Sequence, residues 1–159
     1  MTTTPNSGDA LEAAILARLK ERFPTLSVEL YPDNPGNYRL KHPKGALLVR
    51  YMGSRYGGTR DMGLLVQERR LAVEITIFMR ALHGDGGIGE VLEAVRLCLA
   101  GFAPEGFGKL RPLGDGFQAE DGGLWRYAVD FETKTTVVEE TAPETAPLAT
   151  KIDFNEGEK

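Results

Sequence analysis

The clearest pattern along the chain is an alternation of apolar and polar side chains over residues 69–80, RRLAVEITIFMR. A period of two predicts a β-strand with one buried face and one polar face. The residues expected on the buried face are Leu71, Val73, Ile75, Ile77 and Met79. Weaker runs of the same kind predict strands over 26–32 and 46–56, and a hairpin over 108–135. We expect the strands at 46–56 and 69–80 to pair as a long hairpin across residues 57–65.

Two further segments place apolar residues three or four positions apart, which predicts amphipathic helices. The first is expected to begin at Asp9, whose side chain can cap free amides while Glu12 completes a capping box, and to end before Pro24. The second runs from Ile88 to Phe102. The resulting order α-β-β-β-α-β-β predicts an α+β fold. We expect a mainly antiparallel or mixed sheet, with two helices packed on one face and a long protruding β-hairpin.

The length of 159 residues and the hydrophobic content of 42% suit one globular domain. We expect residues 1–8 to be a disordered N-terminus, 9–135 the folded domain and 136–159 a flexible acidic tail. The tail holds two lysines and six acidic residues, a net charge of −4 that equals that of the whole chain. The body is therefore neutral and has no net field to attract nucleic acid or an anionic membrane. Within the tail, Ile152 and Phe154 form a possible arm that could dock as a short strand on a neighbour.

The chain has no apolar run near the roughly 18 residues that a membrane span needs. The N-terminal residues MTTTPNSGD do not resemble a signal peptide. Cys98 is the only cysteine, which excludes an internal disulfide, and it falls on the apolar face of the second helix. We therefore expect a protein that folds in a reducing cytoplasm.

Gly84, Gly86 and Gly89 are spaced as G-x-G-x-x-G just before the second helix. Dinucleotide-binding turns share this spacing, but they follow a buried parallel strand and need an acidic ribose ligand about 20 residues later. The preceding strand instead alternates like a half-solvated antiparallel strand, and Asp115 lies inside a Gly-Asp-Gly turn. We interpret the loop as a corner between strand and helix. A small nucleotide-binding domain that uses the Gly84–Gly89 loop is the alternative from a different functional class.

The sequence contains no recognisable catalytic or metal-binding set. His42 and His83, the only histidines, lie in separate predicted loops, and no further His or Cys has a suitable ligand spacing. None of the serines, Ser7, Ser27 and Ser54, lies in a G-x-S-x-G motif. We therefore expect a structural protein with no enzymatic activity, cofactor or metal.

The most informative stretch is residues 50–70, where arginine and tyrosine surround apolar residues near a glycine-rich hairpin end. Exposed apolar residues are a liability in a monomer, and arginine with aromatic residues is enriched at protein interfaces. We predict a protein–protein interface here, against the alternative that the tip folds back on its own sheet. Nucleic-acid contact is less favoured because Asp61 and Glu68 interrupt the basic residues. The candidate interface residues are Arg50, Arg55, Tyr56, Arg60, Met62, Leu64, Leu65, Arg69 and Arg70.

Three segments resemble a family of small tail proteins of Mu-like phages and prophages. They are YPDNPGNYRLKHPKGALLVRYMGSRYG, RRLAVEITIFMR and GFGKLRPLGDGFQAEDGGLWRYAVDFET, in this order, with a glycine-rich turn between the second and third. The resemblance spans residues 9–135 and leaves out the acidic tail. It implies a tail terminator, or tail completion, protein: an α+β domain without catalytic residues that forms a hexameric ring on the finished tail tube and stops tube growth.

The resemblance also implies partners and a location. The expected partners are other copies of the chain, the tail tube protein, neck or head-completion proteins and, in a contractile tail, the sheath protein. DNA is expected to pass through the ring without specific binding, which suits the neutral body. The location is the neck end of the virion tail, after assembly in the host cytoplasm. A related alternative is the terminal cap of a phage-derived contractile injection particle that carries no DNA.

Overall fold

The computed structural model describes residues 4–61 and 63–141, which form a five-stranded sheet with two α-helices. The strands lie in the order β1-β2-β3-β5-β4; β1 is parallel to β2, and the other pairs are antiparallel. This arrangement confirms the predicted α+β fold and element order. The elements are α1 (Gly8–Arg22), β1 (Ser27–Leu30), the 3₁₀ turn η1 (Pro35–Asn37), β2 (Gly45–Asp61), β3 (Leu65–Met79), α2 (Ile88–Leu99), β4 (Arg111–Asp121) and β5 (Leu124–Val138).

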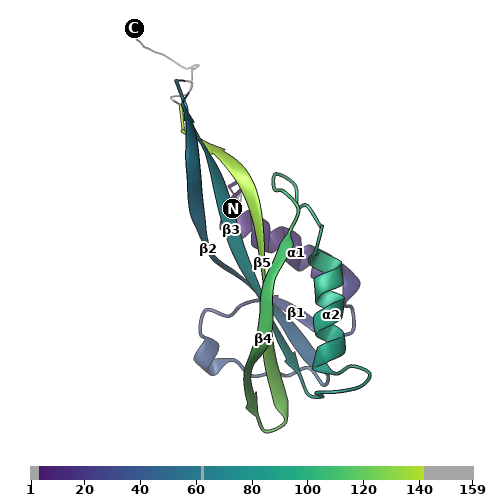
Figure 1. The fold of residues 1–159 in the computed structure, drawn as a ribbon. Coiled ribbons are helices and arrows are strands. Elements are labelled where there is room, and N and C mark those ends of the chain that lie inside the picture. The colour runs from purple at the N-terminus through teal and green to yellow at the C-terminus, as the bar shows by residue number, and fades with distance from the viewer. Residues whose placement is uncertain (1–3, 62, 142–159) are drawn as a thin grey trace.

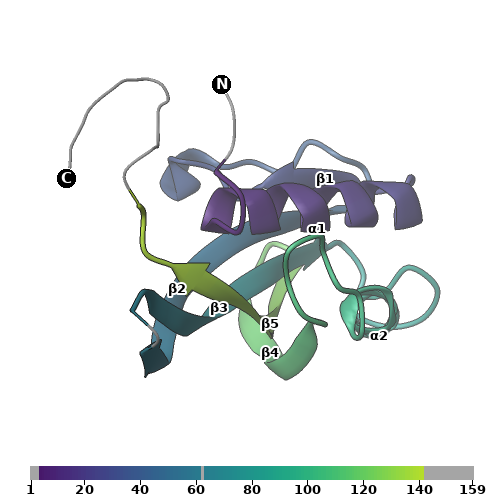
Figure 2. The same cartoon turned by 90° about the horizontal axis from the view of Figure 1, so that it is seen from above.

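Both helices cover the same face of the sheet (Figures 1 and 2). The five alternating residues predicted for the buried face of β3 are all buried there. They pack against Leu11, Ile15 and Leu19 of α1 and against the apolar face of α2, in one continuous core. At about 25 cal/mol per Å² of apolar area, burial of this face is the main force that holds the two layers together.

The opposite face of the sheet carries no α-helix, and at one end it is covered by the loop between β1 and β2, which contains η1. The ring of Tyr38 in this loop lies 5.4 Å from the ring of Phe78 on β3. Tyr31, just after β1, lies under the guanidinium of Arg50, at 4.1 Å. We refer to this side as the helix-free face. It carries the even-numbered residues of β3, such as Glu74 and Thr76, opposite the buried odd-numbered ones.

One end of the sheet extends well beyond the helices (Figure 1). β1 pairs with β2 only up to Val49, and β4 pairs with β5 only as far as Glu132. Beyond these points β2, β3 and β5 continue as a three-stranded extension, which we call the blade: residues 52–61, 63–71 and 133–138. The sequence pattern predicts a two-stranded hairpin here. The third strand was not expected, because residues 136–138 were assigned to the tail.

The predicted hairpin connection at 57–65 is wrong, because β2 continues through the glycine pair to Asp61 and β3 begins at Leu65. Two irregularities in the β2–β3 pairing, at Tyr51/Gly53 and Tyr56/Thr59, accommodate the glycine-rich sequence. Gly53 has a φ of +127°, which only glycine adopts without strain. The extra residue at this bulge changes which side chains of β2 point to each face.

The predicted start of the first helix needs a correction. Ser7, and not Asp9, is the N-cap, and its hydroxyl accepts a hydrogen bond from the amide of Ala10 over 3.1 Å. Glu12 does not close a capping box; its carboxylate accepts from the amide of Tyr51 on β2 over 2.7 Å. The helix starts earlier because Ser7 has the extended backbone that lets a short hydroxyl reach the third helical amide. It ends at Arg22, in front of Pro24, as predicted.

Candidate interaction surface

The predicted interface residues lie on β2, β3 and the turn between them. Met62 lies outside the described residues, as do Ile152 and Phe154 of the proposed docking arm. Arg50 lies below the blade, in the body of the sheet. The other candidates lie on the blade, where some are tied into intramolecular contacts and others point outward.

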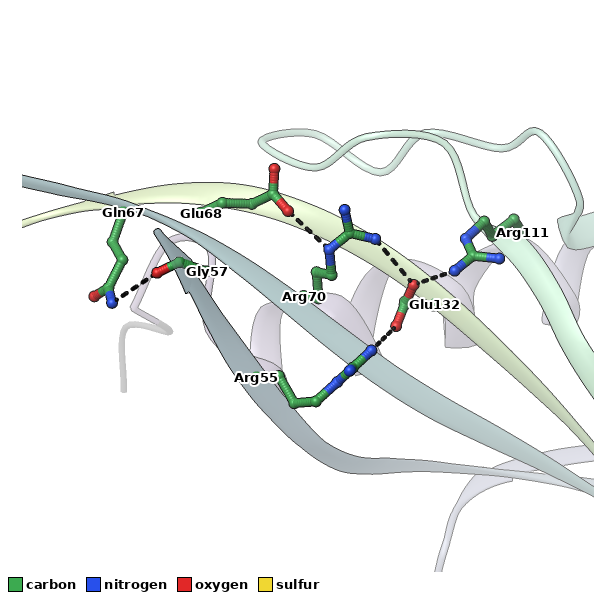
Figure 3. A network of polar contacts seen from close by, with 7 residues as sticks. All are labelled: Arg55, Gly57, Gln67, Glu68, Arg70, Arg111 and Glu132. Carbon is green, nitrogen blue, oxygen red and sulfur yellow. Dashed lines mark hydrogen bonds and ion pairs between the residues drawn. The ribbon is translucent and has the colours of Figure 1, made fainter. Parts of the chain in front are cut away.

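Arg55 and Arg70 converge on Glu132, a residue that the sequence analysis did not single out (Figure 3). Arg55 Nη2 on β2 lies 3.3 Å from Glu132 Oε2, and Arg70 Nη1 on β3 lies 3.6 Å from Oε1. Arg111 Nη2, at the start of β4, donates to Oε1 over 2.6 Å. The Glu132 side chain on β5 is only 7% exposed, and arginines from β2, β3 and β4 surround its carboxylate.

The arginines determine the charge state of this carboxylate. Burial raises the pKa of Glu132, but hydrogen bonds from Arg111 and Arg55 outweigh the burial and lower it below its usual value. Glu132 is therefore a fixed anion at the base of the blade. Nearby, Arg70 also pairs with Glu68 over 2.7 Å, and Gln67 donates to the carbonyl of Gly57 over 3.1 Å (Figure 3). The contacts of Glu132 join β2, β3, β4 and β5 where the blade leaves the body, and the Gln67–Gly57 contact joins β2 to β3 nearer the tip.

Arg69 lies on the other face of the blade and joins it to the N-terminal segment. Its guanidinium donates to Ser54 Oγ over 2.9 Å, to the Tyr51 hydroxyl over 3.0 Å and to the carbonyl of Asn6 over 3.3 Å. It also lies over the ring of Tyr56, at 5.6 Å. Arg69 therefore has a clear structural role within one chain.

Arg50 forms a second ionic group on the helix-free face. Its Nη2 lies 2.7 Å from Glu74 Oε1. Asp130 of β5 lies beside this pair, and its pKa is raised by burial and by the negative charge of Glu74, against a smaller opposing effect of Arg50. Within the described part of the chain, Asp130 Oδ1 is buried without a hydrogen-bond partner. Ionisation of Asp130 therefore costs the folded state stability.

The outward-pointing candidates are Arg60, Tyr56, Leu64 and Leu65. Leu64 and Leu65, at the tip, are 41% and 47% exposed. Two more apolar residues of the blade are exposed and were not among the predicted candidates: Met52 at its base and Val138 near its tip. Met52 lies at the Gly53 bulge, and Val138 lies in the segment that was assigned to the tail. The blade thus leaves apolar and cationic side chains uncovered, while their role as an interface stays a prediction.

A second exposed apolar surface, also missed, lies on the β4–β5 hairpin at the opposite end of the sheet (Figure 1). Phe117 is 56% exposed, and its ring lies 6.1 Å from Trp125 and 5.8 Å from Tyr127. Leu113 on the same edge strand is also exposed. The sequence holds a signal for this strand in the alternation of Leu113, Asp115 and Phe117 with glycines, although the Gly-Asp-Gly segment favours a turn.

The glycine-rich loop before α2 turns a corner, as predicted. The preceding strand β3 is antiparallel to both of its neighbours, which is not the setting of a dinucleotide-binding turn. The amide of Gly86 donates to Glu90 Oε1 over 2.9 Å, so the protein's own carboxylate occupies this amide. The amide of Gly87 donates to the carbonyl of Gly84 over 3.0 Å.

The remaining chemistry of the described residues is sparse. No three His, Cys, Asp or Glu side chains in this part of the chain lie close enough to hold a metal ion. The ring of His42 accepts from the amides of Lys44 and Gly45, over 3.1 and 3.3 Å. Cys98 is buried in the core, as expected. None of the described helices is long and apolar enough to cross a membrane.

Comparison with known proteins identifies a family and a fold. Residues 15–156 match the model of a family described as Gp37 protein. The structure is similar to a chain in the structure "Virion of native gene transfer agent (GTA) particle", with a TM-score of 0.55 and 14% sequence identity. The match covers 84% of this chain and 100% of that chain, so the two share a fold over most of their length. No curated protein sequence matches the chain.

Proposed function

The chain belongs to the Gp37 protein family, and from this premise we propose that it is a structural protein of a phage or phage-derived virion. More specifically, it is a tail terminator that forms a homo-oligomeric, hexameric ring on the end of the tail tube. The observation that carries the proposal is the fold shared with a virion chain. The structural match extends over the full length of that virion chain.

The described surface supports a role in assembly. A closed ring of identical subunits needs two different patches on each subunit, which meet on neighbouring copies. The chain leaves exposed apolar residues both on the blade and on the β4–β5 hairpin, and uncovered surface of this kind usually marks a contact with another protein. The proposed protein is not an enzyme.

The ring would end growth of the tail tube and present its outer surface to neck or head-completion proteins, and to the sheath protein in a contractile tail. The neutral body suits a channel for DNA, because phosphate neutralisation by a strongly basic lumen would retard the passage of the duplex.

The decisive experiment is to purify the particles, quantify the chain in them by mass spectrometry and image the neck by cryo-electron microscopy. We expect a fixed number of copies per particle and a ring of density at the head-proximal end of the tube. Mass photometry of the purified chain at micromolar concentration complements the imaging. A chain that is monomeric in solution and absent from the particles would contradict the proposal.

A further inference from the structure

The two ends of the sheet carry opposite charges. The blade holds four arginines and Lys134 against Asp61 and Glu68, a net charge of +3, and Glu132 at its base offsets one of these positive charges. Residues 117–125, which form the end of the β4–β5 hairpin, hold Glu120 and Asp121 and no basic residue, a net charge of −2. We call residues 117–125 the hairpin end.

The two regions are far apart on one rigid element. The β3–β5 pairing runs from Val66 and Val138 at the blade to Met79 and Trp125 near the hairpin end, without a shift in register. At about 3.4 Å per residue, this pairing alone spans about 45 Å. Neither region can therefore neutralise the other within one subunit, and Figure 1 shows them at opposite ends of the molecule.

Each region also exposes apolar side chains that could form the centre of a contact. The blade offers Tyr56, Leu64 and Leu65, and the hairpin end offers Phe117. Aromatic residues and arginine are the residue types most often found at the energetic centre of an interface. The charges would surround this apolar centre as a polar rim.

The combination favours one kind of contact. Two blades facing each other, or two hairpin ends, would bring like charges together, whereas a blade against a hairpin end pairs opposite charges. We propose that the blade of one copy packs on the hairpin end of the next copy. This contact is heterologous: each subunit uses one surface as donor and the other as acceptor, which is how identical subunits close into a ring. The inference rests on the proposed function, since it specifies how the ring is joined.

Charge exchange tests the pairing in assembled particles. The blade variant T59E/R60E changes the charge of this exposed residue pair from +1 to −2 and leaves the Glu132 group untouched. The hairpin variant E120K/D121K makes the hairpin end positive. We expect each variant alone to reduce the copies of the chain per particle at least tenfold, as measured by quantitative mass spectrometry. A variant that carries all four changes restores opposite charges at the two substituted residue pairs and should recover to within about threefold of the original chain.

Co-expression of the two single-end variants gives a second readout. The negative residues 59 and 60 of one variant then meet the positive residues 120 and 121 of the other at one contact, and the original charges meet at the next, so alternating copies should also restore incorporation. The matched control is K20E/E21K, two exposed changes on α1 that should leave incorporation unchanged. Thermal unfolding by circular dichroism monitors the fold. If a reversal variant unfolds, the neutral variants R60Q and E120Q/D121N replace it, with a smaller loss expected.

The outcomes separate this inference from the function. If the original chain is in the particles but neither single-end variant changes its copy number, or the fourfold variant is as defective as its parents, the blade-to-hairpin contact is wrong and the proposed function stands. If the original chain is absent from the particles, the proposed function itself fails.

Discussion

Arg111, the first residue of β4, lies opposite Glu132 of β5, and its Nη2 donates to Oε1 of that carboxylate over 2.6 Å. The contact lies where β4 ends its pairing with β5 and the blade begins. Arg55 of β2 and Arg70 of β3 contact the same carboxylate. The Glu132 side chain on β5 therefore links four strands.

We expect E132Q to reduce the free energy of unfolding by about 1–3 kcal/mol at pH 7, because charge-assisted hydrogen bonds are lost from a buried site. The folded-state pKa of Glu132 is lowered, so its contribution is present above the unfolded pKa and is lost as pH falls through the folded pKa. Urea unfolding at several pH values should therefore show the two proteins converging below about pH 4. E68Q, at an exposed pair, is the control; a constant difference for E132Q across this range would contradict the ionic explanation.

D130N should change the free energy of unfolding in the opposite direction to E132Q. Burial and Glu74 raise the folded-state pKa of Asp130, so ionised Asp130 costs stability at neutral pH. That cost disappears as pH falls through the folded pKa, because the folded state then takes up the proton more readily than the unfolded state. We expect D130N to unfold at higher urea concentration than the original chain at pH 7, with a difference that shrinks on acidification. A less stable variant at pH 7 would show that the carboxylate has a favourable partner.

G53A should destabilise the chain by about 1–3 kcal/mol, because a φ of +127° is strained for any residue with a Cβ. G58A is the matched control: it lies on the same strand, without a positive φ and with open space around its Cβ position. The control should change stability by less than about 0.5 kcal/mol. Equal effects in thermal unfolding would mean that the bulge is free to relax.

L64D/L65D should leave the fold intact and block assembly. Both side chains are exposed at the blade tip, so charges there should lower the melting temperature by less than about 3 °C. Copies of the chain per particle should fall about tenfold or more if the tip is an interface. L71D is the contrast, because Leu71 is fully buried and a charge there should unfold the domain. Normal incorporation of L64D/L65D would remove the tip from the interface.

A nucleotide screen tests the glycine loop directly. A ligand that binds with a Kd of about 10 μM would stabilise the fold by about 2.7 kcal/mol at about 1 mM, a change that thermal shift detects easily. We expect no shift with dinucleotides or mononucleotides, since Glu90 occupies the Gly86 amide. A reproducible shift that is lost in a variant of the loop would favour the nucleotide-binding alternative.

Local patterns in the sequence predicted the body of the fold well. The period of two in β3 and the helical spacing in α2 were reliable because burial on one face imposes both patterns. The glycine pair at 57–58 led to a wrong prediction of where the hairpin connection begins. Glycine usually marks a turn, but here it lies in a bulged strand. The choice between Ser7 and Asp9 as a cap depended on backbone geometry that composition does not reveal.

The candidate surface was less predictable, because it depends on strand register. Glu132 and its arginines come from four strands that are distant in sequence, and they meet only after β2, β3, β4 and β5 have paired in a particular order. Residues 50–70 could be selected as arginine-rich, yet the sequence could not show which arginines are committed within the subunit. Arg69 and Arg70 form contacts with other residues of the same chain, whereas Leu64 and Leu65 remain exposed.

The uninterrupted β3–β5 pair also fixes the distance between the blade and the hairpin end. Because its register does not shift between the blade and the hairpin end, the distance and twist between the two surfaces are built into one stiff strand pair. In the proposed ring, the diameter would then be dictated by strand length and not by loop flexibility. Lengthening both strands by the same two residues would widen the aperture, while loop insertions of equal size would leave it unchanged.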